Sequence, residues 1–353
     1  MKPFKIMGKK KKGLRIGLLI FLVFFAIAAY LAYTYYQKIF QPISSLKEDR
    51  YFHIYSDWEM DDLKNALLEE RIIQDTASFN WVAEQKSFTQ PKAGRYFIES
   101  GMSNNSLVNL FRSGQQVPVN VTFNSVRTKK QLASVVSNQL ELDSISLLQL
   151  LESNEFAQKY GFDRATFLTL FIPNTYEFYW NTNAEEFVQR MAKEYKRFWT
   201  EERKAKAAKL GLSQSEVSIL ASIVQTEQMS RVEERPKVAG LYINRLKRGM
   251  RLQSDPTLIY ALGDFSIKRV LNKHKELNSP YNTYLYAGLP PGPIYLPDQS
   301  SIDAVLNFER HNYLYMCAKA DFSGYHNFSR TLNQHNIYAR QYQRELNRRK
   351  IMR

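Results

Sequence analysis

The segment Ser213–Val238, SQSEVSILASIVQTEQMSRVEERPKV, carries the clearest helical signal in the chain. Ser213 and Glu216 have the spacing of a capping box, in which each side chain bonds the other residue's backbone N–H at the start of a helix. The stripe that follows occupies positions i, i+3, i+7 and i+10 of one helical face: Val217, Leu220, Val224 and Glu227. The pattern predicts a helix whose apolar face ends in a carboxylic acid.

Glu227 is the unusual member of this stripe. A carboxylate at the end of an apolar face loses hydration, and burial disfavours the charged form. The pKa of Glu227 is therefore expected to rise toward the range in which the side chain donates a proton near neutral pH. Periodicity alone leaves open an ordinary helix end, with Glu227 facing solvent or paired with Arg231.

The N-terminus has the composition of a membrane anchor. Residues 1–15 include Lys and Arg but no acidic residue, and the uncharged apolar stretch 16–36 has the roughly 20 residues that a helix needs to cross a bilayer. The positive-inside rule then predicts a cytoplasmic tail (1–15), one transmembrane helix (16–36) and an extracytoplasmic remainder. The alternative is a cleaved signal peptide, since Ala26 and Ala28 have the spacing of a cleavage site, but the long apolar run favours an uncleaved anchor.

The composition of the 353-residue chain excludes several classes of protein. The part after the anchor is long enough for two or three domains. The formal net charge of +15 suits an anionic polymer outside the membrane, where nucleic acid is not expected. Cys317 is the single cysteine, and the five His residues lack metal-ligand spacing. The sequence therefore predicts no disulfide framework, no metal site and no cofactor.

Residues 45–126 are expected to form a small α/β module. Within Gly94–Phe123 the apolar spacing predicts a strand, a helix between Ser103 and Gly114, and a second strand around Val119. A larger region, 127–345, follows.

The larger region combines helices with irregular segments. Helical periodicity extends from Thr128 to about Lys209. It is interrupted at Phe171–Trp180, FIPNTYEFYW, where Pro173 and Asn174 predict a turn among core aromatic residues.

A second helix, Glu234–Lys247, is predicted after the Glu227 segment and ends at Gly249. Further along, the Gly- and Pro-rich stretch Gly288–Pro293 predicts an irregular wall. Rings, amides and hydroxyls near these segments are of the kind that contact sugars, although each one singly is typical of a turn or a core. The candidate substrate-binding residues are Gln253, Ser254, Asp255, Tyr281, Asn282, Thr283, Tyr284 and His326.

Six ordered motifs resemble those of the endolytic murein transglycosylases, the YceG-like family: ASIVQTE, ERPKVAGLYINRL, GMRLQSDPTLIY, YNTYLYAGLPPGPI, YLY, and HNF followed by HN. The resemblance extends from about Gly94 to Ile337, and FIPNTYEF is similar to the family's FPDTY segment. It implies an α+β protein with an N-terminal transmembrane helix, a LysM-like module at 45–126 and a mixed helix-and-strand catalytic domain at 127–345.

The resemblance also implies a chemistry. Glu227 would be the catalytic acid of a lytic transglycosylase, which cleaves the β-1,4 bond between N-acetylmuramic acid and N-acetylglucosamine and leaves 1,6-anhydromuramic acid ends, helping to terminate or trim nascent strands. Many relatives have an acid where this chain has Gln225, which implies that position 225 is dispensable. Asn174 stands where Asp is usual, so a catalytic role there is in doubt.

Two alternatives remain. A hydrolase needs two carboxylates, and Asp255 or Glu234 would be the second, although these positions also suit a turn and a helix start. A non-catalytic peptidoglycan-binding scaffold has no use for the acid at Glu227. The expected location is the cytoplasmic (inner) membrane, crossed once, with the catalytic domain outside or in the periplasm. The expected partners are peptidoglycan glycan strands, with cell-wall synthases left open and no nucleic acid.

Overall fold

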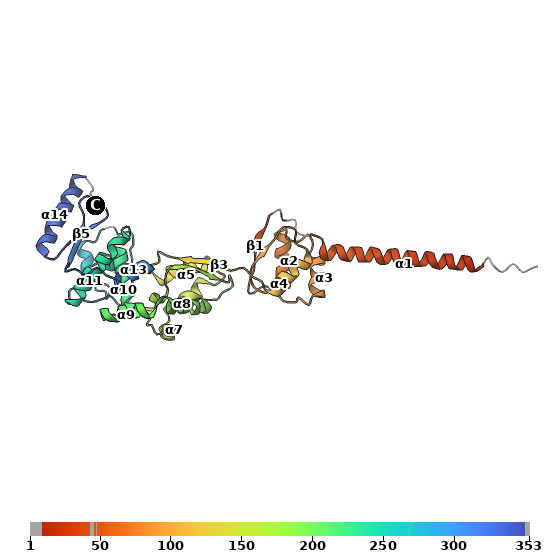
Figure 1. The fold of residues 1–353 in the computed structure, drawn as a ribbon, viewed down its shortest axis with the longest axis horizontal. Helices are drawn as coiled ribbons and strands as arrows, with labels where there is room; N and C mark the ends of the chain where they lie inside the picture. Colours follow the sequence, from red (N-terminus) through yellow and green to blue (C-terminus); the bar gives the residue numbers. More distant parts are fainter. Residues whose placement is uncertain (1–8, 43–45, 47, 268, 350–353) are drawn as a thin grey trace, which may run out of the picture. The chain divides into compact units, whose positions relative to one another are not determined.

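The computed structural model describes residues 9–42, 46, 48–267 and 269–349. The chain divides into two compact units. The first contains the described residues up to Val119 together with Tyr179–Asn181, and the second contains Asn120–Phe178 and the described residues from Thr182 onward. Figure 1 shows helices and strands in both units, as expected for an α+β protein.

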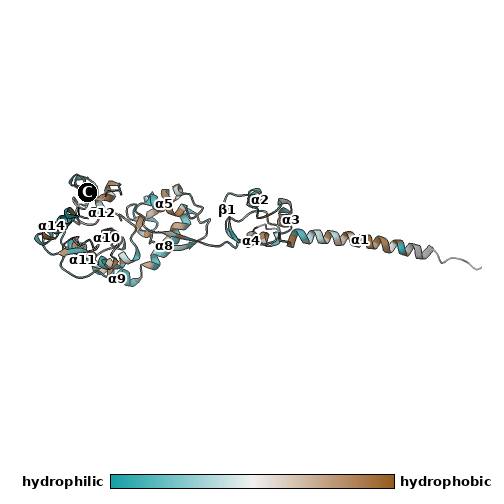
Figure 2. Ribbon diagram, turned by 90° about the horizontal axis from the view of Figure 1, so that it is seen from above, coloured by the Kyte–Doolittle hydropathy of each residue, from teal (hydrophilic) through white to brown (hydrophobic). Residues whose placement is uncertain are grey.

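A long helix, α1 (Lys9–Phe40), begins the described chain. Its segment Leu14–Phe40 is 27 residues long, is apolar enough to cross a membrane and is not buried within the protein. Figure 2 shows hydrophobic residues along most of it. The predicted apolar helix at 16–36 is therefore present, and it continues to Phe40. Residues 1–8 of the predicted tail lie outside the described residues.

The first unit packs three helices against a two-stranded antiparallel sheet. Its elements after α1 are β1 (Arg50–Ile54), α2 (Met60–Glu69), α3 (Thr76–Gln85), β2 (Gly94–Ile98) and α4 (Asn104–Ser113). The predicted helix is present as α4: the Ser103 hydroxyl accepts a bond from the Ser106 N–H at 3.2 Å, and Gly114 ends the helix with φ of 72°.

The second strand predicted for this module is present, and its partner lies outside the module. The strand exists as β3 (Val119–Phe123), but it pairs with β4 (Asn174–Phe178) and not with β2. The partner of β2 is β1, which the sequence reading missed. The segment at Phe171–Trp180 also differs from expectation, because residues after Pro173 form β4 where a turn was predicted. Its aromatic residues Phe171, Tyr176 and Phe178 are buried, as predicted for a core.

The second unit contains the remaining elements. They are η1 (Phe167–Leu170), η2 (Val232–Glu234), η3 (Asn272–Glu276), α5 (Lys129–Ser137), α6 (Ser144–Glu152), α7 (Asn154–Gln158), α8 (Ala184–Phe198), α9 (Glu201–Leu210), α10 (Gln214–Glu227), α11 (Arg235–Lys247), α12 (Asp255–Leu262), α13 (Gln299–Leu306), β5 (Tyr315–Ala318), β6 (His326–Ser329) and α14 (Leu332–Arg348).

The helix α10 is the centre of this unit. It contacts α9, α11, α12 and α13, and α11 and α13 also pack against each other. Every residue of α10 from Val217 to Gln225 is buried, which is the pattern of a helix surrounded by protein. The hairpin of β5 and β6 and the helix α14, which packs on both strands, come after this bundle.

Candidate active site

Glu227 is the last residue of α10, as the sequence predicted. The capping box fixes where the helix starts, since the Ser213 hydroxyl accepts a bond from the Glu216 N–H at 3.2 Å and the Glu216 carboxylate accepts one from the Ser213 N–H at 2.8 Å. Val217, Leu220 and Val224 are fully buried below it. A rigid, buried helix therefore holds the carboxyl group of Glu227.

Two hydroxyl groups donate to the same oxygen of Glu227. Tyr242 on α11 donates to Oε1 at 2.7 Å, and Ser254 donates to the same atom at 2.5 Å. The other oxygen, Oε2, makes no hydrogen bond to any residue that the structure describes. One side of the carboxyl group is therefore fixed by protein, and the other is available to a ligand.

The environment raises the pKa of Glu227 above its usual 4.5. Burial is the main cause, and the nearby charge of Asp255 adds to it. The hydrogen bonds from Ser254 and Tyr242 oppose the rise but do not cancel it. Burial and the adjacent Glu227 also raise the pKa of Tyr242, which keeps this phenol protonated as a donor. The result is a carboxyl group that holds its proton more tightly than an exposed glutamate does.

Glu227 opens onto a cleft of 380 Å³ in the second unit. The side chains that line it come from α10, α11, α14, β5, the start of α12 and the loops around residues 253 and 284. They are Glu227, Leu241, Tyr242, Arg245, Leu252, Gln253, Asp255, Tyr284, Tyr315, Met316, Leu332 and His335. A mixed lining of rings, charges and amides beside one acid is suited to a sugar ligand.

Three of the predicted binding residues line this cleft with Glu227: Gln253, Asp255 and Tyr284. The Tyr284 hydroxyl donates to Asp255 Oδ1, and burial together with this bond raises the pKa of Tyr284. Gln253 has a φ of 51°, a strained value for a residue other than glycine. Such strain, held in a cleft wall, is typical of a functional site.

Three other predicted residues lie below the surface and shape the cleft. Ser254 holds Glu227, and its own N–H donates to Thr283 Oγ1 at 3.0 Å. Asn282 is fully buried, and its amide donates to the Lys275 carbonyl at 3.0 Å and accepts from the Tyr284 N–H at 3.0 Å. These contacts give Thr283 and Asn282 structural roles in place of the predicted substrate contacts.

Tyr281 and His326 lie elsewhere. Tyr281 packs against Tyr260, with ring centroids 4.9 Å apart, in a separate hollow of the second unit. His326 on β6 binds the buried Glu234, through Nδ1 at 2.8 Å and through its backbone N–H at 2.9 Å. Glu234 also accepts a bond from Gln228, and these bonds hold its pKa below the usual value despite burial. The Glu234 carboxylate is thus occupied by protein groups.

Gln225, expected to be dispensable, has a structural function. Its side chain is buried and accepts bonds from the Asp298 N–H at 2.7 Å and the Ser301 hydroxyl at 3.1 Å. These bonds fix the start of α13 to α10. Position 225 therefore supports the fold in this chain.

Several cleft residues were missed from the sequence. Tyr242 and Arg245 are buried on α11, and Arg245 donates to the Leu252 carbonyl at 2.8 Å and the Leu314 carbonyl at 2.7 Å, which fixes two cleft walls. His335 also lines the cleft, and its buried Nδ1 atom makes no hydrogen bond to the residues that the structure describes. The available signal was that Tyr242 and Arg245, three apart, share one face of the helix with each other.

The fold and the site define a mixed helix-and-strand protein with one sequestered, protonatable carboxyl group beside an open cleft. The sequence profile of the YceG-like family matches residues 52–341, and the chain belongs to this family. The resemblance indicated by the motifs is confirmed.

Named relatives cover most of the chain. An endolytic murein transglycosylase from Bacillus subtilis (strain 168) is 27% identical over 328 residues, which are 88% of this chain and 90% of the relative. One from Streptococcus pneumoniae serotype 2 (strain D39) is 25% identical over 87% of this chain and 61% of its own length. The crystal structure of a yceG-like protein from Listeria monocytogenes matches with a TM-score of 0.56 and 28% identity, over 83% of this chain and 99% of that chain.

A test of the site's electrostatics is Tyr242→Phe. The Tyr242 hydroxyl stabilises the carboxylate form of Glu227, so its removal should raise the pKa of Glu227 further. Asp255→Asn should act in the opposite direction, because it removes a like charge. Carbon-13 NMR titration of labelled Glu side chains measures both shifts. A fall in the Glu227 pKa in Tyr242→Phe would contradict this account of the site.

Proposed function

We propose that the protein is a membrane-anchored lytic transglycosylase that cleaves within peptidoglycan glycan strands, with Glu227 as its single catalytic acid and base. The observation that carries the proposal is the protonatable carboxyl group of Glu227, fixed through one oxygen and open to the cleft through the other. The names of the relatives, endolytic murein transglycosylases, support the same substrate.

The reaction needs one group that first gives and then takes a proton. Protonated Glu227 donates its proton to the oxygen that bridges N-acetylmuramic acid and N-acetylglucosamine, and the bond from that oxygen to the muramic C1 breaks. The muramic C6 hydroxyl then bonds to C1 and its proton passes to the carboxylate of Glu227. The enzyme ends protonated, no water is consumed, and the product carries a 1,6-anhydro ring.

The hydrolase alternative requires a second carboxylate that activates water. Of the two residues considered, Glu234 is buried and occupied by His326 and Gln228. Asp255 lines the cleft, and one of its carboxylate oxygens accepts a hydrogen bond from Tyr284. Asp255 is therefore the second carboxylate that a hydrolase would use.

The masses of the products decide between the two reactions. Purified sacculi are digested with the full chain, and the released muropeptides are analysed by mass spectrometry. Transglycosylation should give anhydromuramic ends, which are lighter by one water than the reducing ends left by hydrolysis. Asp255→Asn should still release anhydro ends. Reducing ends as the main product, abolished by Asp255→Asn, would assign the hydrolase.

We also propose that α1 anchors the protein with its N-terminus in the cytoplasm and the rest of the chain outside. The basic residues before the apolar segment support this orientation. Protease added to spheroplasts should therefore degrade most of the chain while the membrane stays intact. A cytoplasmic marker protein provides the control for leakage. Survival of the full-length chain would overturn the orientation.

The first unit is proposed to bind glycan as a LysM-like module without taking part in the chemistry. Tyr55, Trp58 and Trp180 form an aromatic cluster in this unit, with Tyr55 and Trp180 centroids 4.9 Å apart and Tyr55 and Trp58 centroids 5.1 Å apart. Tyr55 is exposed, and aromatic faces are common partners of sugar rings.

A further inference from the structure

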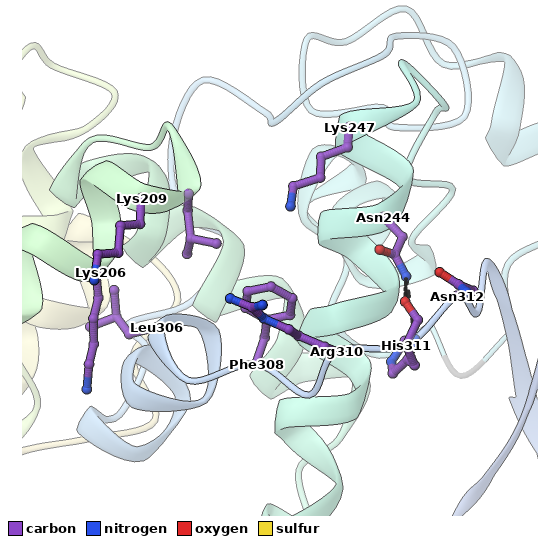
Figure 3. A pocket seen from close by; sticks show the side chains of 10 residues that line it. Lys206, Lys209, Asn244, Lys247, Leu306, Phe308, Arg310, His311 and Asn312 are labelled. Carbon is purple, nitrogen blue, oxygen red and sulfur yellow. Dashed lines mark hydrogen bonds between the residues drawn. The ribbon is translucent and has the colours of Figure 1, made fainter.

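A second hollow in the second unit is larger than the cleft of Glu227. It has a volume of 630 Å³ and is formed by α9, α11 and the segment 306–312 that follows α13. Figure 3 shows its side chains, with lysines on facing helices and Arg310 between them. We call it the basic groove.

The basic groove is lined by four basic side chains, Lys206, Lys209, Lys247 and Arg310, and by no acidic side chain. Lys206 already has partners, since it binds Glu202 at 2.7 Å and Asn307 at 2.8 Å. Lys209, Lys247 and Arg310 are exposed and form no ion pair with the residues that the structure describes. These three cations are available to an external anion.

The acidic residues of the surrounding elements do not neutralise these three cations. Each one pairs with another base: Glu201 with Lys204, Glu202 with Lys206, Asp303 with Arg203, and Glu309 with Lys237. The helix α11 itself contains no acidic residue. A field of one sign in a concave surface attracts anions more strongly than the same charges on a flat surface.

The groove is rigidly built. The Asn244 amide donates to the His311 carbonyl at 2.7 Å, and Nε2 of His311 bonds to the Lys237 carbonyl at 2.9 Å. Gly240 permits this close approach, because a Cβ there would lie 2.3 Å from the Glu309 carbonyl oxygen. The backbone on both sides of Arg310 is thus fixed, which lowers the entropic cost of ordering this segment around a ligand.

The floor of the groove identifies the class of anion. Leu210, Leu306 and Phe308 provide an apolar surface between the cations, and the Asn312 side chain adds a polar group. A peptide with carboxylates offers aliphatic side chains, backbone amides and charge together. A phosphodiester polymer offers charge without apolar side groups. The mixed lining therefore favours an acidic peptide.

The groove and the cleft use different faces of one helix. Tyr242 and Arg245 of α11 line the cleft, whereas Asn244 and Lys247 line the groove. Residues two apart on an α-helix point about 200° apart, and a helix is about 10–12 Å wide. An extended peptide of about four residues reaches about 14 Å. A short peptide attached to a glycan in the cleft is thus comparable in length to the helix that separates the two sites.

We propose that the basic groove binds the carboxylate-bearing peptide of peptidoglycan, through Lys209, Lys247 and Arg310, and so makes the protein prefer peptide-substituted strands. This inference rests on the proposed function for the identity of the polymer. It adds a peptide subsite, remote from Glu227, that selects among strands.

The test measures binding without turnover. The full chain carrying Glu227→Gln is titrated calorimetrically with two probes, a disaccharide tetrapeptide with free carboxylates and the same disaccharide without peptide. The groove variant combines Lys209→Gln, Lys247→Gln and Arg310→Gln. The matched control combines Lys193→Gln, Lys196→Gln and Arg197→Gln, which changes the net charge equally on α8, away from the groove.

The groove variant should bind the peptide-bearing probe about tenfold more weakly at low salt, the loss expected from three exposed ion pairs, and should bind the peptide-free probe normally. The α8 control should bind both probes within about twofold of the parent. Amidation of the probe's carboxylates should weaken its binding to the parent to the level of the groove variant. Unchanged binding of the peptide-bearing probe by the groove variant would overturn the proposal.

Two further experiments distinguish this proposal from a phosphodiester-binding groove and from a failure of the proposed function. Poly(glycerol phosphate) tests the phosphodiester alternative, and tight groove-dependent binding of it, with no discrimination of peptide, would also overturn the assignment. Product analysis of the chain with Glu227 intact tests catalysis separately. Groove-dependent peptide binding in a chain that never cuts glycan would refute the proposed function and leave the subsite in place. Cutting with equal kcat/KM on bare and peptide-bearing strands would refute the preference.

Discussion

Glu227→Gln should abolish the release of anhydromuramic ends, with turnover falling by at least the 10²- to 10⁴-fold range of general acid-base catalysis. The amide keeps the size of the side chain and can still accept the bonds from Tyr242 and Ser254, but it has no proton to give and take. Binding of glycan should persist. Turnover on purified sacculi, followed by mass spectrometry of the products, measures the loss.

The pH dependence gives an independent readout of the same residue. A group that must be protonated limits activity on the alkaline side, and the raised pKa of Glu227 moves that limit above the usual 4.5. Tyr242→Phe should move the alkaline limb further up, and Asp255→Asn should move it down while retaining activity. Normal release of anhydro ends by Glu227→Gln would remove this residue from the mechanism.

The raised pKa of Glu227 should also make the stability of the fold depend on pH. The folded protein binds the Glu227 proton more tightly than the unfolded chain, whose pKa is near 4.5, so the contribution of Glu227 to stability falls as pH rises from 4.5 toward its folded pKa. The Glu227→Gln variant has no titrating group at this position, so it does not lose stability in this way as pH rises. Its stability relative to the parent should therefore increase with pH across that window, which urea unfolding at several pH values would detect.

Local sequence signals predicted the helix that carries Glu227 but not the residues that bind its carboxyl group. The capping box and the apolar stripe of α10 involve residues within one helix, and they placed Glu227 correctly. The hydroxyls that hold it come from Tyr242 and Ser254, 15 and 27 residues away. Contacts between separate elements depend on tertiary packing, which no local pattern of the sequence encodes.

The pairing of the strands was not visible in the sequence for the same reason. The helix α4 and its flanking strands were visible as local patterns. The strand β3, however, pairs with the distant strand β4, and the hydrogen bond between Thr122 and Thr175 joins residues that are 53 positions apart. Adjacent strands in sequence pair often enough to make β2 the natural guess. The pairing with β4 was not foreseeable from alternation alone.

Irregular loops were the hardest part of the site. Tyr281, Asn282, Thr283 and Tyr284 are consecutive, yet only Tyr284 lines the cleft while Asn282 and Thr283 are buried. A helix or strand has a period that separates inward from outward residues, and a loop has none. The motif therefore located the wall of the site without assigning its members.

Arg235→Met should be among the most destabilising single changes in the second unit, at about 3 kcal/mol, the lower part of the range for breaking a buried ion pair. The Arg235 side chain is only 3% exposed and binds Asp298 at 2.8 Å and the Gln228 carbonyl at 2.9 Å. It thus ties the end of α10, one residue after Glu227, to the start of α13. Methionine fills similar space, but it removes the positive charge beside the Asp298 carboxylate and the donor to the Gln228 carbonyl.

The matched control is Arg203→Met, because Arg203 forms a comparable two-point pair with Asp303 at 3.0 Å but is 26% exposed. Its loss should cost at most about 1 kcal/mol. Hydrogen exchange at the amides of α10 and α13 measures both effects, and the amides of α4 in the first unit serve as an internal reference. Arg235→Met should accelerate exchange at the end of α10 far more than Arg203→Met does. Equal effects of the two changes would mean that burial of Arg235 does not govern the order of the helix end that carries the acid.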